Sequence, residues 1–332
     1  MAEATVKSTS TTQPTTPPAS DNPLLVEVLE GRRKSVARMM SLAESTGEAN
    51  RALMAEMHRH AGRAHVVGLT GVPGSGKSTM ARALTQKIRE SGRTVGIVAI
   101  DPSSPFSGGA ILGDRIRMAD ITGDPGVFIR SMATRGELGG LARATLDVAD
   151  IMDAAGYDVV IIETVGVGQD EVDVVQAAHT VIVVSAPGLG DEVQAIKAGV
   201  LEIADIHVVS KSDRPDARQT AINLRSMLKL GSIGSGLSTW EVPVVSTSAQ
   251  NSEGIDKLVE TIDTHGRHLT DTGEIEGRRR KILEMRIVKA AEDIVRERIL
   301  HKGRDKLERL IDRSLAQQID PYNAAAVLLD DS

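Results

Sequence analysis

The stretch Gly71-Val72-Pro73-Gly74-Ser75-Gly76-Lys77-Ser78-Thr79 decides the fold of this 332-residue chain. It follows a short apolar run and precedes a helix-compatible stretch, which is the context that the pattern G-x-x-x-x-G-K-[ST] requires. Glycines let successive backbone N–H groups turn inward around an anion, and the N-terminus of the next helix adds a favourable dipole. Lys77 is then expected to reach the β- and γ-phosphates, and the Ser78 hydroxyl to ligate Mg²⁺. The stretch therefore predicts the phosphate loop of a P-loop NTPase; the alternative is a chance glycine-rich turn.

On both sides of this loop, short β-branched runs alternate with helix-compatible stretches. Most of the runs are continuously apolar, which is typical of strands covered on both faces by helices. The alternation predicts an α/β fold with a mostly parallel central sheet flanked by helices. The expected strands are His65–Thr70, Thr94–Ile100, Gly126–Ser131, Asp158–Glu163, Thr180–Ser185, Ile206–Ser210 and Val242–Ser246. The expected intervening helices are Ser78–Ser91, Leu138–Ala155, Asp191–Ile203 and Pro215–Leu230.

The rest of the chain predicts helical extensions on either side of this domain. Residues 1–22 are rich in Ser, Thr and Pro and cannot bury enough apolar area to offset ordering entropy, so we expect a disordered tail. Apolar residues at helical spacing predict two or three short helices over residues 23–62. The P-loop domain is expected to cover residues 63–272. A helical segment follows over residues 273–332, with Gly303 separating two final helices.

Composition excludes several functional classes. The chain has 39 Lys+Arg against 45 Asp+Glu, a net charge of −6, and only 2% aromatic residues, so neither a basic face nor a base-stacking platform for nucleic acid is expected. It contains no cysteine, which excludes disulfides and thiolate metal sites. Its apolar runs are far shorter than the ~20 residues of a membrane span. We expect a soluble, cytoplasmic protein without a nucleic acid or membrane partner.

Two later loops favour guanine as the base. Lys211 and Asp213 follow a strand and match N-K-x-D, in which the Asp accepts hydrogen bonds from guanine and the Lys stem covers the ring. Ser210 replaces the expected Asn, which usually braces the loop rather than selecting the base. After the next strand, the segment containing Ser248, Ala249 and Gln250 resembles the second guanine loop. The pair of loops favours GTP over ATP; the alternative is a surface Lys–Asp pair beside a polar turn.

The strand before residue 164 delivers Glu163 to the position where most GTPases carry the Asp of D-x-x-G. Glu163 can support the Mg²⁺ shell, and Gly166 is placed to sense the γ-phosphate. Val167 stands where a water-orienting Gln is common, and its side chain cannot position water. Slow intrinsic hydrolysis is therefore expected, with Gln169 as a partial substitute.

Asp101 and Asp114 flank a Pro-, Ser- and Gly-rich stretch that suits a nucleotide-sensing switch. Asp101 ends a predicted strand, where ligands bind in open α/β sheets. Both carboxylates are candidate Mg²⁺-shell residues, although Asp114 can also cap a following helix. Arg115, Arg117 and Arg135 are candidates for transition-state charge, with a solvated surface role as the alternative.

Three strings resemble the methylmalonyl-CoA mutase-associated GTPases, the MeaB/ArgK group. They read D-P-S-S-P-F-S-G-G-A-I-L-G-D-R at 101–115, E-T-V-G-V-G-Q at 163–169 and P-G-L-G-D-E-V-Q-A-I-K-A-G at 187–199. The resemblance covers about residues 24–320. It implies a GTPase chaperone that gates adenosylcobalamin delivery to an acyl-CoA mutase and protects that enzyme. It also implies a homodimer, with the C-terminal helices contributing to the contact.

The resemblance also assigns roles to individual residues. It makes Lys77, Ser78, Asp101, Asp114 and Glu163 the phosphate and Mg²⁺ residues of a GTP/GDP site, with Lys77, Asp101 and Glu163 serving hydrolysis. Lys211 and Asp213 become the guanine contacts. The 187–199 string matches a further switch loop, whose Asp191, Gln194 and Lys197 are implied to couple nucleotide state to the mutase; by themselves the acidic residues there are an ordinary helix start.

Three other functions stay open on the sequence. A metal-insertion GTPase for nickel or cobalt enzymes would need Cys or clustered His, whereas His58/His60 and His265/His268 are expected to be ordinary surface residues. A transport-associated kinase would need a route to an exported substrate. A nonhydrolysing scaffold would use GTP for structure alone.

Overall fold

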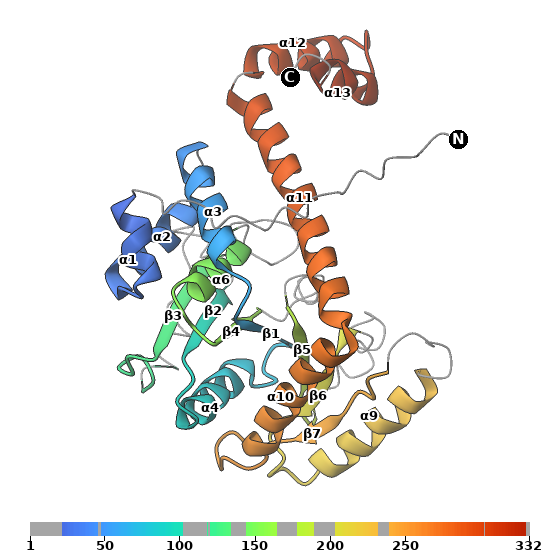
Figure 1. Ribbon diagram of the computed structural model, residues 1–332. Helices are drawn as coiled ribbons and strands as arrows, with labels where there is room; N and C mark the ends of the chain where they lie inside the picture. Colours follow the sequence, from blue (N-terminus) through green and yellow to red (C-terminus); the bar gives the residue numbers. More distant parts are fainter. Residues whose placement is uncertain are drawn as a thin grey trace, which may run out of the picture.

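The computed structural model describes residues 22–45, 48–101, 118, 120–133, 144–164, 178–188, 203–231, 239–301 and 303–329. At its centre lies a seven-stranded sheet in which every neighbouring pair of strands is parallel (Figure 1). The order is β3-β2-β4-β1-β5-β6-β7. The strands are β1 (His65–Thr70), β2 (Val95–Asp101), β3 (Val127–Ala133), β4 (Val159–Glu163), β5 (Thr180–Ser185), β6 (Ile206–Val209) and β7 (Val244–Ser246). This confirms the predicted α/β class, with strand ends shifted by up to two residues.

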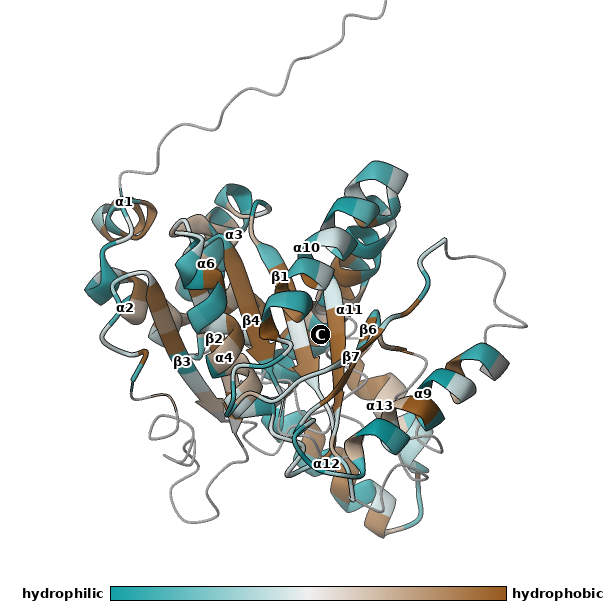
Figure 2. Cartoon of the chain, turned by 90° about the horizontal axis from the view of Figure 1, so that it is seen from below, coloured by the Kyte–Doolittle hydropathy of each residue, from teal (hydrophilic) through white to brown (hydrophobic). Residues whose placement is uncertain are grey.

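Helices cover both faces of the sheet, which explains why most of its strand residues are apolar (Figure 2). Alternate residues of one strand face opposite sides, so Ile161 of β4 packs with α4 and α10 while Ile162 packs on the other face. The helices of the first face are α4 (Lys77–Glu90) and α10 (Ile255–Thr272). Those of the second are α1 (Pro23–Leu29), α2 (Arg33–Ala43), α3 (Glu48–His60) and α6 (Thr145–Ala154).

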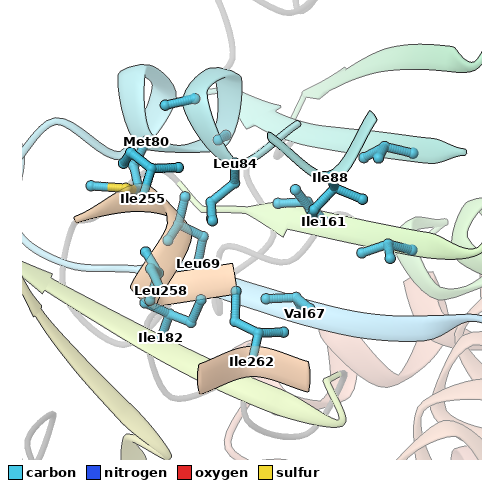
Figure 3. Close-up of a cluster of buried hydrophobic side chains, with 14 of the residues drawn as sticks. Val67, Leu69, Met80, Leu84, Ile88, Ile161, Ile182, Ile255, Leu258 and Ile262 are labelled. Atoms are coloured by element: carbon cyan, nitrogen blue, oxygen red, sulfur yellow. The ribbon is translucent and has the colours of Figure 1, made fainter. Parts of the chain in front are cut away.

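The core between α4, α10 and the sheet fixes the helix that carries the phosphate loop. Met80, Leu84 and Ile88 of α4 lie at helical spacing and are at most 2% exposed. They belong to one cluster with strand residues such as Leu69 and with Leu258 of α10 (Figure 3). The start of α4 is thereby held at the carboxyl end of β1, where a nucleotide binds in open α/β sheets.

The C-terminal helices leave the domain as an arm. Helix α11 (Glu274–His301) runs away from the sheet and carries α12 (Arg304–Leu315) and α13 (Pro321–Leu329) at its far end (Figure 1). Gly303 separates α11 from α12 as predicted, while the further break before Pro321 was not predicted. Proline lacks a backbone N–H and favours the first turn of a helix, so α13 starts at Pro321.

Ion pairs fasten α11 to the α/β domain. Arg278 donates to both carboxylate oxygens of Asp205 next to β6, with Nη1 at 2.8 Å from Oδ2. Two turns further on, Arg286 reaches the α6 carboxylates of Asp147 at 3.0 Å and Asp150 at 2.8 Å. The first half of α11 is therefore tied to the amino end of β6 and to α6.

Candidate functional site

The phosphate loop connects β1 to α4 and needs its glycines for steric reasons. Gly71 has φ +140°, and a Cβ there would lie 2.1 Å from the Val184 carbonyl oxygen of β5. Gly74 and Gly76 have φ +79° and +94°, a region that L side chains rarely adopt. The loop is thus pressed against β5 at its start and turns through left-handed residues into the first turn of α4.

Lys77 and Ser78 lie at the N-terminus of α4, as the sequence predicted. Lys77 is 7% exposed, and its Nζ donates to the carbonyl oxygens of Gly71 at 2.6 Å and Val72 at 3.3 Å. The Ser78 hydroxyl donates to Glu163 Oε1 at 2.5 Å. Since β4 lies beside β1 in the sheet, a carboxylate 85 residues away in the chain reaches the phosphate loop. The pair of oxygens suits Mg²⁺, which prefers hard oxygen ligands.

The other predicted phosphate and switch residues are only partly described. Asp101 is the last residue of β2, and its backbone lies at the same sheet edge because Ala99 pairs with Glu163. Its side chain lies outside the described residues, and so do the whole residues Asp114, Gly166, Asp191, Gln194 and Lys197. Val167, Gln169 and the three candidate arginines also lie outside the described ranges.

A cavity of about 240 Å³ adjoins the phosphate loop and brings together the two predicted guanine loops. Asp213 Oδ1 accepts a 2.7 Å hydrogen bond from the Ser248 hydroxyl, and this bond holds the pKa of Asp213 below its usual value. The backbone N–H of Ser212 donates to the Thr247 carbonyl at 3.0 Å, which ties the loops to each other. The lining residues are Gly76, Thr79, Met80, Ser210, Lys211, Asp213, Arg214, Ser248, Ala249 and Gln250. An ionised carboxylate in such a cavity can accept the ring N–H and amino group of guanine.

Three residues of this cavity were not assigned to the site from the sequence: Met80, Ser210 and Arg214. Ser210 was noted only as a departure from Asn; its hydroxyl lies 2.6 Å from the Ser75 carbonyl oxygen. Arg214 Nη1 donates to the Pro187 carbonyl at 3.2 Å, where β5 has ended. The position of Arg214 directly after Asp213 was the available signal for its presence in the cavity.

The histidine pairs considered as metal ligands have other partners, and one expectation about them was wrong. His265 is not a surface residue. It is fully buried near the amino end of β5, where its Nδ1 lies 2.8 Å from Thr180 Oγ1. Burial lowers the pKa of His265 to about 3. His58 instead contacts Asp150 at 2.8 Å, and this hydrogen bond raises its pKa. Among the described residues, no three His, Cys, Asp or Glu side chains are grouped to hold a metal ion.

No helix within the described ranges combines the length and the hydropathy needed to cross a bilayer.

The features of the site define a P-loop GTPase. They are the parallel sheet, the glycine-rich loop at the start of α4, the Ser78–Glu163 pair and the cavity around Asp213.

Comparison with known proteins identifies the family within this class. A model of the family described as methylmalonyl Co-A mutase-associated GTPase MeaB matches residues 36–304, and the chain belongs to that family. A protein of Pyrococcus abyssi strain GE5 / Orsay named as a GTPase is 45% identical over 307 residues, 92% of this chain and 95% of the relative. The mouse methylmalonic aciduria type A homolog, a mitochondrial protein, is 32% identical over 327 residues, 92% of this chain and 78% of the relative.

Among solved structures, the chain resembles a LAO/AO transport system kinase with a TM-score of 0.67 and 25% identity. The likeness covers 92% of this chain and 95% of that structure. It therefore extends beyond the phosphate loop to the helical segments at both ends.

Proposed function

We propose that this GTPase is a chaperone that gates adenosylcobalamin delivery to methylmalonyl-CoA mutase, or a related acyl-CoA mutase, and protects that enzyme. The observation that carries the proposal is the family match over residues 36–304, whose description names association with this mutase. The nucleotide site gives the match a mechanism, because a GTPase can report its bound nucleotide to a partner through loops near the γ-phosphate. The kinase alternative has the name of one solved structure in its favour, whereas the family model that matches most of the chain is described as a GTPase.

In the proposed reaction, Lys77, Ser78 and Glu163 serve the phosphates. Lys77 Nζ, which donates hydrogen bonds to the loop carbonyls in this structure, would turn to the β- and γ-phosphate oxygens and neutralise their charge. Ser78 and Glu163, whose oxygens are 2.5 Å apart, would hold Mg²⁺ directly or through water, with Asp101 and Asp114 as further shell residues. Bound there, Mg²⁺ would neutralise the negative charge that develops on the phosphates in the transition state.

The base is read in the cavity beside the phosphate loop. Asp213 accepts from guanine, Lys211 covers a face of the ring, and the loop at Ser248–Gln250 closes the cavity from the other side. The support is the shared cavity and the Asp213–Ser248 hydrogen bond. We assign GTP and GDP to this site on that basis.

We further infer slow hydrolysis by the protein alone and acceleration by the mutase. Val167 cannot orient the attacking water, so a partner-induced rearrangement has to supply that function. Asp191, Gln194 and Lys197 are the proposed coupling residues. A location in the cytoplasm belongs to the same proposal.

The C-terminal arm is the proposed homodimer contact. Its helices expose large apolar side chains: Leu315 is 78% exposed and Tyr322 is 89% exposed. Burying such side chains against a second copy would stabilise the dimer by roughly 25 cal/mol per Å² of apolar area.

The test is phosphate release from GTP with and without purified methylmalonyl-CoA mutase. We expect a slow rate for the protein alone and a much faster rate when the mutase is added. Lys197→Ala should keep the basal rate and lose the stimulation, whereas Lys257→Ala, an exposed residue of α10, should keep both. A basal rate on the order of 1 s⁻¹ that the mutase leaves unchanged would contradict partner activation. Affinity capture from the native extract, with the bound cobalamin enzymes identified, tests the partner itself.

A further inference from the structure

The turn that follows β7 lines the guanine cavity and is closed by its own backbone. Ser248 and Glu253 form an antiparallel bridge, in which the Ser248 N–H donates to the Glu253 carbonyl at 2.9 Å and the Glu253 N–H donates back at 3.0 Å. Ala249 and Gln250, which line the cavity, lie inside this bridge. Within the part of the chain that the structure describes, their backbone N–H groups have no hydrogen-bond partner. The turn therefore offers two unpaired donors beside the cavity.

Guanine needs a donor of this kind. The ionised carboxylate of Asp213 only accepts hydrogen bonds, so it can serve the ring N–H and the amino group of the base but not its 6-oxygen. The Ser248 hydroxyl already donates its one proton to Asp213 at 2.7 Å. The backbone N–H groups of the turn remain for the 6-oxygen, so the position of the turn decides whether this oxygen is recognised.

Gly254 sets the position of the turn relative to β7. It lies directly after the bridge and directly before α10, with φ +73°. A Cβ at Gly254 would lie 2.3 Å from the Ser246 carbonyl oxygen at the end of β7 and 3.3 Å from the Thr247 Cα. Both are backbone atoms, so no side-chain rotation could relieve the contact. Only glycine lets the start of α10 approach the strand this closely.

The core prevents α10 from yielding to such a contact. Ile255, Leu258 and Ile262 are at most 3% exposed and belong to the cluster that packs α10 against α4 and the sheet (Figure 3). The Leu258 N–H also donates to the Gly254 carbonyl at 3.0 Å, so Gly254 is joined to the first turn of the helix. A side chain at position 254 would therefore displace the more exposed turn and open the bridge that closes it.

We propose that Gly254 is a positioning residue for recognition of the guanine 6-oxygen. Its missing side chain lets α10 begin against β7, and this contact holds the turn where the N–H groups of Ala249 and Gln250 meet the base. Gly254 does not itself line the cavity, so it acts through the turn. This role of Gly254 rests on the proposed assignment of guanine to the cavity.

The test compares GDP with 2-aminopurine riboside 5′-diphosphate, which keeps the amino group of guanine but lacks the 6-oxygen. Affinities are measured by displacement of a fluorescent GDP analogue from the full-length wild-type and variant proteins. Gly254→Ala should lower the preference for GDP over the 2-aminopurine nucleotide by about 5- to 30-fold, the effect of losing the hydrogen bond to the 6-oxygen. A role in stability alone would weaken the binding of both nucleotides equally.

Gly273→Ala is the matched control. Gly273 lies at the other end of α10 with φ +76°, so alanine meets the same backbone strain there, but a Cβ would have no atom within 4 Å. This variant should keep the preference of the wild type. Gly254→Asn is a second test variant, because asparagine adopts left-handed angles more readily than alanine while its Cβ makes the same contact. It should show the same loss of preference, also where the alanine protein fails to fold.

Any of three results would overturn the role of Gly254: the wild type has no preference for GDP, a Gly254 variant that folds keeps the preference, or Gly273→Ala loses it equally. Asp213→Ala separates these results from a failure of the proposed guanine site. If Asp213→Ala binds GDP as tightly as the wild type, guanine does not occupy the cavity and both proposals fail. If Asp213→Ala binds GDP weakly while Gly254→Ala keeps the preference, only the role of Gly254 is wrong.

Discussion

Replacing His265 by asparagine should make the protein's stability less sensitive to acid. In the folded protein His265 is fully buried on α10, with Nδ1 on the Thr180 hydroxyl and its ring centroid 4.8 Å from that of Trp240. The same hydroxyl contacts His65 Nε2 at 2.7 Å, and the Arg278 guanidinium also faces His265. Burial, followed by the nearby Arg278, His65 and His268, lowers the pKa of His265 from 6.5 to about 3, and this lowering outweighs the Asp205 carboxylate that lies 3.4 Å from its Nε2.

The size of the effect follows from the pKa difference between the two states. Between its folded and unfolded pKa values, His265 is neutral in the native state and protonated in the unfolded chain. The unfolded state therefore binds more protons, and stability falls as pH drops below 6.5. For a shift to about 3, His265 alone costs about 2 kcal/mol of unfolding free energy between roughly pH 7 and pH 5.

Urea unfolding at the two pH values, followed by fluorescence of the single tryptophan, measures this contribution. His265→Asn is less stable at neutral pH because it packs less well against Trp240, but its loss of stability on acidification should be smaller than that of the wild type by about 2 kcal/mol. Leu269→Ala, one turn along α10 and fully buried, is the matched control with no titratable group. Equal acid sensitivity of His265→Asn and wild type would refute the reasoning.

Three further variants test the site and the arm. Lys77→Ala removes the buried ammonium and should weaken GDP binding by about 10- to 100-fold, so an unchanged affinity in titration calorimetry contradicts its role. Gly71→Ala would place a Cβ 2.1 Å from a β5 carbonyl, and thermal unfolding should show a much lower midpoint with GDP binding lost. Arg278→Leu removes the guanidinium from the Asp205 carboxylate, which keeps the Val181 N–H as a donor; urea unfolding should show a loss of about 1–3 kcal/mol, and proteolysis should cleave α11 faster.

The phosphate loop and the guanine segments were predictable because their chemistry is encoded locally. The glycines at 71, 74 and 76 specify backbone conformations that few other residues adopt, and Lys77 and Ser78 follow them at fixed spacing. The strands could also be predicted from their apolar runs, because strands that are buried on both faces are mostly apolar. The assignments of Asp114, Asp191, Gln194 and Lys197 stay predictions, because these residues lie outside the described ranges.

Other features depend on which segments become neighbours, and no local pattern encodes that. The order β3-β2-β4-β1-β5-β6-β7 sets Glu163 beside Ser78, and the contact of Ser210 with Ser75 joins residues 135 apart in the chain. The burial of His265 could not be predicted either, because it results from Trp240 and β5, which pack against this side chain from distant parts of the sequence. By itself the sequence determined a P-loop NTPase, since a phosphate loop depends on a few consecutive residues, and three further strings indicated the family. Only the tertiary structure decided which distant side chains complete the site, because that choice minimises the free energy of packing the whole sheet.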